Sequence, residues 1–477
     1  MSEPSSNGHS TNGVAPPAGK ATASSADYGK TASFLAVGVG LTGVITYAYF
    51  LIASHTLSKP DYGQITVLWS AVFITISTLY RPIEQLLSRH ISERVVTGQS
   101  LSEPMKVAST IQFGLSLLFA VLALALRGPI QNSLLEGNET LYWVFFTSVL
   151  FYAASYFARG FLAGKQQFGL FVALILSESC FRTIFAVLVA VSVLTGQSAV
   201  AIGITAAPAL SLLVVPFAFA RKAQQDKATA PPPAAVGDEP DEAFSFRSGG
   251  GFAAAVLLIM FSEQAFLNAG PLIIRGLQGA AEAGFIFNVL MLARAPLQLF
   301  QSISTSILPH LTSLHASDDP DSDRQFSHTV KMVLLGIVAF TALVVVVVLI
   351  AGPKCMQIAF GKNFTYDRLG LLLVTFGMGL YLASVTLNQA CVAQGQVRRA
   401  AVRWITCAAI FIGWNFLPLV SNEQRRVEAG FLVAAAVLFA LLYWVYRRPH
   451  LDHPEDVPKP GSPEELEARL AVMDENV

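Results

Sequence analysis

Polar and charged side chains inside long apolar stretches are the residues of this chain that could do chemistry. Two stretches, 62–88 and 283–308, carry polar side chains at spacings of three and four residues, and this spacing places them on one face of a helix. The first face holds Ser77, Arg81, Glu84 and Ser88, and the second holds Arg294, Gln298, Gln301 and Thr305. Charges inside a membrane need partners or a wet cavity. The two faces predict opposite walls of a substrate cavity, unless Arg81 and Glu84 simply pair at the membrane interface.

Three further charges are candidates for coupling transport to an ion. Glu178 and Arg182 lie four residues apart with the acid first, which is the favourable order for an ion pair within one helix. Glu263 has no basic neighbour at helical spacing, and a carboxyl group of that kind can exchange protons. A purely structural role is the alternative for all three residues.

Two prolines lie within the polar helices. Pro82 and Pro296 each remove an intrahelical hydrogen bond and are candidates for helix kinks. A bent helix suits a gate, although many membrane helices carry proline without gating.

The rest of the chain offers no pattern typical of an enzyme. The 8 histidines lie in loops, span ends or tails, and the 4 cysteines form no close pair. No zinc spacing, catalytic triad pattern or nucleotide-binding loop is present. We therefore expect no catalytic residue, no metal site and no cofactor. The net charge of zero gives no reason to expect nucleic acid as a partner.

The elements that position these residues are membrane-spanning helices. Hydrophobic residues make up 53% of the 477 residues and charged residues only 13%, against about 25% charged in soluble domains. The mean hydropathy is +0.55. Continuous apolar runs predict an all-α polytopic membrane protein with about twelve spans. These spans are 31–54, 62–88, 107–126, 140–158, 168–194, 198–220, 250–274, 283–308, 328–352, 366–391, 402–420 and 428–446.

The spans divide into two six-helix lobes. The predicted parts are a disordered tail (1–28), a first lobe (29–220), a Pro- and Ala-rich linker (221–248), a second lobe (249–448) and a tail with a short helix (449–477). Most of the 31 lysines and arginines fall in segments on the side of the N-terminus. The positive-inside rule therefore predicts that both termini and the linker are cytoplasmic.

The two lobes show signs of an internal repeat. A shift of 221 positions places residues 30–90 on 251–311 without a gap. A shift of 230 places 163–166 (AGKQ) on 393–396 (AQGQ). With six helices per half, these are parallel repeats.

Several segments resemble a known transporter superfamily. The stretch LSKPDYGQITVLWS (57–70) resembles the opening of polysaccharide-biosynthesis flippases, a branch of the multidrug/oligosaccharidyl-lipid/polysaccharide exporter superfamily. The stretch EAGFIFNVLMLARAPLQLFQSISTSILPHLTS (282–313) is similar to the superfamily's seventh-to-eighth helix region. AGKQQF (163–168) and AQGQVRR (393–399) resemble its inner-loop motifs.

This resemblance implies two six-helix lobes around a central cavity and transport by alternating access. The expected function is a flippase that moves a lipid-linked oligosaccharide, a precursor of cell-envelope polysaccharide, across the plasma membrane. The expected partners are the lipid-linked glycan, membrane lipid and glycan-assembly proteins. Two alternatives stay open: a cation-coupled drug or small-molecule antiporter of the same superfamily, and a membrane-embedded glycan polymerase or ligase.

Overall fold

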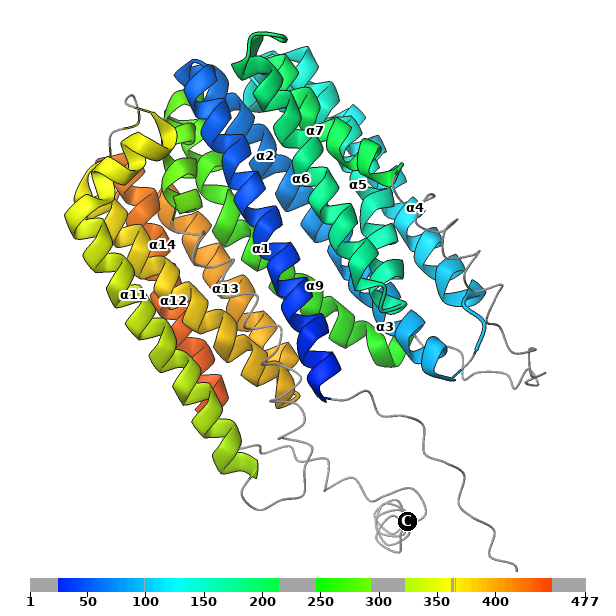
Figure 1. The fold of residues 1–477 in the computed structure, drawn as a ribbon. Helices are drawn as coiled ribbons and strands as arrows, with labels where there is room; N and C mark the ends of the chain where they lie inside the picture. The colour runs from blue at the N-terminus through cyan, green and yellow to red at the C-terminus, as the bar shows by residue number, and fades with distance from the viewer. Residues whose placement is uncertain are drawn as a thin grey trace, which may run out of the picture.

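The protein is built from long helices. The computed structural model describes residues 25–97, 99–213, 246–292, 322–361, 364 and 366–447, and the regular structure within these ranges is helical throughout (Figure 1). The first half contains α1 (Ser25–Thr56), α2 (Lys59–Leu79), α3 (Arg81–Thr97), α4 (Ser102–Ala125), the π-helix η1 (Pro129–Leu134), α5 (Glu139–Gly164), α6 (Phe168–Ala190) and α7 (Gly196–Leu212). The second half contains α9 (Phe246–Leu277), a short apolar helix (Ala280–Leu292), α11 (Ser322–Phe360), α12 (Arg368–Ala393), α13 (Val397–Phe416) and α14 (Glu423–Arg447).

The helices account for the predicted spans. Within the described ranges, nine helical segments are long and apolar enough to cross a membrane, and α7 and Ala280–Leu292 are shorter apolar helices. The described part of each predicted span includes a helix, and the span 62–88 falls on two, α2 and α3. The prediction of an all-α polytopic membrane fold is confirmed.

Side chains at the helix starts fix where several helices begin. The Ser58 hydroxyl accepts from the Asp61 N–H at 3.3 Å, and Pro60 lies in the first turn of α2. Asp367 caps α12 by accepting from the backbone N–H groups of Leu369 and Gly370. Such caps satisfy N–H groups that have no partner within the helix.

The helices form two lobes with the same internal packing. In Figure 1, α4 to α7 gather on one side and α11 to α14 on the other, with α1 and α9 between them. The pairs α1–α6, α6–α7, α5–α7 and α4–α5 of the first lobe correspond to α9–α13, α13–α14, α12–α14 and α11–α12 of the second, and all eight pairs are in contact. The packing therefore repeats in the order that two six-helix repeats require.

The third helix of each half lies at the periphery. Helices α4 and α11 bury little of their apolar surface, and Phe113 and Ile350 are 70% and 76% exposed. Such faces are stable only in an apolar solvent, so lipid must cover them.

One apolar cluster continues from the first lobe into the second. Phe50 on α1 lies 4.6 Å, between ring centroids, from Phe287, and Tyr62 on α2 lies 5.4 Å from Phe364. These contacts lie at the end of the molecule where α1 and α9 end and α2 and α12 begin. The predicted topology makes this the outer end.

The second predicted span is interrupted in its middle. Helix α2 ends at Leu79 and α3 begins at Arg81, directly before Pro82. Pro82 has no N–H to donate to the carbonyl of Thr78, so the regular ladder stops there. Ser77 therefore lies in the last turn of α2 and Arg81 at the start of α3, so the predicted polar face runs across this break in the helix.

The segment boundaries differ slightly from the prediction. Helix α1 begins at Ser25, within the predicted tail 1–28, and α9 begins at Phe246, within the predicted linker 221–248. The rest of these two segments, and the predicted tail 449–477 with its short helix, lie outside the described residues.

Candidate functional site

A buried ion pair joins α5 and α6 in the first lobe. The Glu178 carboxylate accepts from the Arg159 guanidinium and from the Ser155 hydroxyl. Glu178 is 2% exposed. Arg159 also lies over the Tyr156 ring, 4.7 Å from its centroid. A buried charge needs this density of partners to remain in an apolar interior.

Arg182 does not pair with Glu178, so the predicted pair within α6 is wrong. Its guanidinium donates to the Tyr152 hydroxyl at 3.0 Å and lies 4.4 Å from the Trp69 ring centroid. Arg159 and Ser155 of α5 occupy the Glu178 carboxylate instead. Interhelical packing therefore overrides the favourable spacing within one helix.

Arg81 and Glu263, from different lobes, lie within electrostatic reach of each other. Arg81, at the start of α3, lies within electrostatic reach of Glu263 on α9 and of Glu84 on its own helix. All three side chains are half-buried. Sequence spacing within α9 could not show this partner of Glu263, because Arg81 comes from a distant part of the chain.

The charges form a row that crosses the molecule. Glu84 lies within electrostatic reach of both Arg81 and Arg159. The row therefore alternates in sign from α9 to α6 through Glu263, Arg81, Glu84, Arg159 and Glu178. Its ends belong to different lobes, so any movement of one lobe against the other changes its contacts.

Arg159 is the residue of this row that the sequence did not predict. The predicted fourth span ended at residue 158, whereas α5 continues to Gly164. The signal was present, because Tyr152, Ser155 and Arg159 follow at spacings of three and four residues. A longer span would have placed Arg159 on this polar face.

Four further predicted site residues lie outside the described residues: Arg294, Pro296, Gln298 and Gln301.

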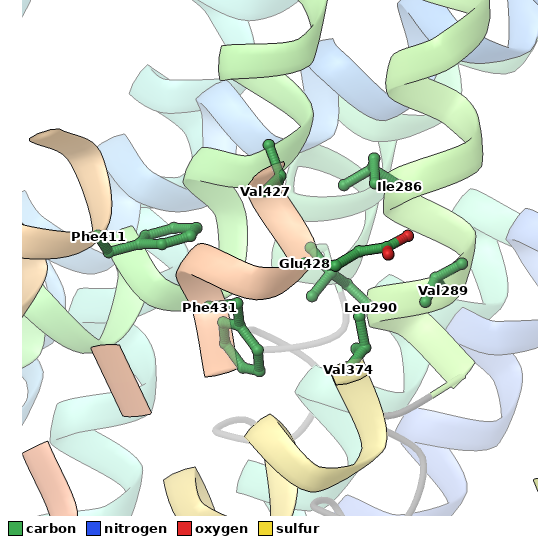
Figure 2. A pocket seen from close by; sticks show the side chains of 8 residues that line it. All are labelled: Ile286, Val289, Leu290, Val374, Phe411, Val427, Glu428 and Phe431. Atoms are coloured by element: carbon green, nitrogen blue, oxygen red, sulfur yellow. The ribbon is translucent and has the colours of Figure 1, made fainter. Parts of the chain in front are cut away.

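A second buried carboxylate lies in the other lobe, near the outer end. Glu428 on α14 accepts from the Tyr366 hydroxyl and from Arg425 at 2.8 Å, and Arg425 also binds Asp367 at 2.7 Å. Figure 2 shows the Glu428 carboxylate directed towards Val289 and Ile286. It borders a small cavity of about 10 Å³, enough for one water molecule. The cavity is lined by Ile286, Val289, Leu290, Val374, Phe411, Val427, Glu428 and Phe431.

Polar contacts also tie the two lobes together at the outer end. Glu136, in the loop between η1 and α5, binds Arg275 of α9 at 3.2 Å and accepts from Gln64 of α2. Tyr62 donates to the Asn288 amide oxygen. Glu136 has a φ of 54°, a left-handed conformation that is uncommon outside glycine. The loop is therefore held in a strained shape that presents this carboxylate to the other lobe.

Two glycines allow a close approach of the lobes beside these contacts. A Cβ on Gly63 would lie 1.7 Å from the Ala280 carbonyl oxygen, and one on Gly284 would lie 3.3 Å from the Gly63 Cα. Gly63 and Gly284 are equivalent under the shift of 221 positions.

The part of the chain that the structure describes contains no candidate metal site. No group of three or more His, Cys, Asp or Glu side chains there could hold a metal ion.

Comparison with known proteins identifies the fold. No family model matches the chain, and no curated protein sequence matches it. A mutant of the Vibrio cholerae MATE transporter VcmN is similar, with a TM-score of 0.61, 14% identity, and coverage of 88% of this chain and 97% of that one.

Two further solved structures are similar over most of their length. An inward-facing multidrug resistance MATE family transporter of the MOP superfamily gives a TM-score of 0.55 at 11% identity, covering 86% of this chain and 97% of that one. The eukaryotic MATE transporter AtDTX14 gives 0.53 at 13% identity, covering 94% and 98%. This protein therefore has the fold of the MATE transporters.

Proposed function

We propose that this protein is a secondary transporter that moves its substrate by alternating access between the two lobes. The observation that carries this proposal is the row of alternating charges from Glu263 on α9 to Glu178 on α6. Each in-span charge costs about 2.5–3.5 kcal/mol on insertion scales, so such groups are kept where they bind or couple. The similar solved structures are of transporters, which supports the same reading.

The proposed substrate is a lipid-linked oligosaccharide with a diphosphate group. The planar guanidinium of Arg81 suits phosphate oxygens, because it donates two parallel hydrogen bonds. Arg81 is half-buried and belongs to the inter-lobe row, so it can exchange partners when the lobes move. We include Arg294 in the proposal as a second diphosphate contact from the other half. The resemblance of 57–70 and 282–313 to polysaccharide flippases supports the choice of substrate.

Coupling follows from competition for Arg81. Glu263 and Glu84 both lie within electrostatic reach of this guanidinium. A diphosphate on Arg81 would displace Glu263, which would then carry an unpaired negative charge in an apolar site and take up a proton. Glu263 is therefore our proposed coupling residue. Glu178, which Arg159 and Ser155 hold in place, has a positioning role.

A second candidate is an antiporter for organic cations. Tyr156, Tyr152 and Trp69 surround the arginines of the first lobe, and aromatic faces beside carboxylates also suit cations. In this case the substrate would bind Glu263 or Glu84 and displace Arg81. The two candidates therefore require opposite behaviour from Arg81 and Glu263.

Substitution of each partner distinguishes the candidates. Purified protein is reconstituted in liposomes with a fluorescent polyprenyl-diphosphate oligosaccharide or a fluorescent organic cation. If the substrate is the diphosphate, Glu263→Gln frees Arg81 and increases affinity by about tenfold, equivalent to about 1.4 kcal/mol, while transport stops responding to a proton gradient. Arg81→Gln then abolishes binding.

The cation candidate predicts the reverse pattern. Arg81→Gln would then tighten binding of the cation, and Glu263→Gln would abolish it. Glu93→Gln, in an exposed pair with Arg89, is the control and should leave both measurements unchanged. If the protein keeps its melting temperature but transports neither probe, the proposed function is rejected.

The proposed location is the plasma membrane, with both termini in the cytoplasm and glycan-assembly proteins as partners. The test is a single cysteine at Ala234, in the predicted linker. In intact cells it should resist an impermeant thiol reagent and react after permeabilisation. Labelling in intact cells would overturn this topology.

A further inference from the structure

Two arginines stack on aromatic rings where α13 and α14 run side by side. The Arg403 guanidinium lies 5.6 Å from the Trp444 ring centroid, and Arg447 lies 5.5 Å from Tyr443. The two rings are 45% and 38% exposed, and the helices contact each other. We call Arg403, Tyr443, Trp444 and Arg447 the inner aromatic–arginine patch.

The patch lies at one edge of the membrane. Arg403 is within two turns of the start of α13, and Trp444 is within one turn of the end of α14. Because the spans alternate in direction, this is the edge at which α1 begins. Tryptophan and tyrosine gather at the level of the lipid headgroups.

The patch has an excess of positive charge. Arg398 is a further exposed arginine in the first turn of α13. Within α13 and α14 the acidic residues are Glu423 and Glu428, both at the far end of α14. The Arg403 Nε is buried and has no hydrogen-bond partner. A buried donor of this kind is costly unless an acceptor reaches it.

The opposite edge of the membrane holds a similar arrangement that is neutral. Arg127 lies 5.4 Å and 5.5 Å from the ring centroids of Tyr142 and Trp143. There the protein supplies its own acceptors, Glu139 at 2.8 Å and Gln131 at 3.0 Å. The contrast indicates that the acceptor for the inner patch comes from outside the two helices.

We propose that the inner aromatic–arginine patch binds the phosphate headgroup of an anionic phospholipid. The guanidinium groups of Arg403 and Arg447 would donate to phosphate oxygens, and Trp444 and Tyr443 would pack against the glycerol and upper acyl chain. The facing leaflet is the cytoplasmic one in the predicted topology, and that leaflet is rich in anionic lipid. This inference stands whether or not the proposed substrate is correct.

Native mass spectrometry of the full-length protein tests the proposal. The probes are phosphatidylglycerol and, as the neutral comparison, phosphatidylcholine of the same acyl chains. The wild-type protein should retain phosphatidylglycerol in preference. Arg403→Gln should weaken that retention about fivefold, the contribution expected of one arginine near an anionic surface, and Arg403→Lys should weaken it less. Arg447→Gln tests the same site if Arg403→Gln does not fold.

The matched control is Arg127→Gln, which should leave retention unchanged. Equal retention of the two lipids, or an equal loss in Arg127→Gln, would overturn the proposal. The acidic segment 452–475 is the competing occupant. If Arg403→Gln has no effect in the full chain but weakens lipid retention once the chain ends at Arg448, the tail holds the patch and the proposal is wrong.

Discussion

Arg159 and Glu178 give the first lobe a buried charge pair. The carboxylate is occupied by Arg159 and Ser155, and the guanidinium rests on the Tyr156 ring. Removal of one partner leaves the other charge without its hydrogen-bonded counter-ion in an apolar interior. The pair therefore sets how tightly α5 holds α6, whatever substrate the protein carries.

Glu178→Gln should destabilise the protein strongly. Breaking a buried pair costs about 3–5 kcal/mol, so the melting temperature in detergent should fall clearly. Glu93→Gln removes a pair whose side chains are 52% and 70% exposed, and such pairs contribute about 0.3–0.5 kcal/mol. A melting temperature that falls equally in both variants would contradict a structural role for Glu178.

Gly370 makes room for the carboxylate of the second lobe. A Cβ at this position of α12 would lie 2.6 Å from the Glu428 Oε1 atom and 2.5 Å from the Tyr366 Cε1 atom. Gly370→Ala should therefore lower the melting temperature. Gly336 on α11 has no atom within 4 Å of such a Cβ, so Gly336→Ala should raise stability by about 0.5–1 kcal/mol through its helix propensity. Stabilisation by both substitutions would show that the Glu428 site is not tightly packed.

At the scale of helices, sequence patterns predicted the elements better than the contacts between them. Long apolar runs identified the spans because lipid contact imposes one composition along a whole helix. The pairing of Glu178 with Arg159, and the approach of Arg81 to Glu263, depend on which helices become neighbours. Residue spacing along one helix does not show which other helices pack against it, so the sequence showed no basic residue near Glu263. Glu428 was missed because it stands at the first residue of its predicted span.

The loop between η1 and α5 links the two lobes, because Glu136 binds Arg275 and accepts a hydrogen bond from Gln64. Glu136→Arg should break this link by repulsion, and Arg275→Glu combined with Glu136→Arg should restore the attraction. The measurement is labelling of a single cysteine at Ser70, which is buried on α2, by an impermeant reagent. Labelling should increase several-fold in Glu136→Arg and return towards wild type in the double variant. Equal labelling in all three proteins would show that the loop does not control access from outside.

At the scale of the whole molecule, several contacts between the lobes lie together at the outer end. Phe50 with Phe287, Tyr62 with Asn288, and Glu136 with Arg275 all lie there. Opening towards the outside must separate these apolar and polar contacts together. We therefore expect that the structure represents a state with its outer end closed.

The two lobes should also assemble as separate chains. Co-expression of 1–230 with 231–477 cuts the chain in the predicted linker and keeps every described contact between the lobes. The halves should co-purify, and the complex should transport the same substrate as the intact chain. Failure of the two halves to co-purify while each is present in the membrane would contradict this expectation.

Gly63 and Gly284 show how the two halves of the chain are related at the boundary between the lobes. Each is the repeat equivalent of the other, and their backbones meet at the boundary between the lobes. A residue that touches its own counterpart is the signature of an isologous interface, the kind that two identical subunits form across a two-fold axis. The contact is thus the one expected if two copies of a six-helix subunit had been joined into one chain. A protein of six such helices with glycine at the position of Gly63 would be able to form the same contact with a second copy of itself.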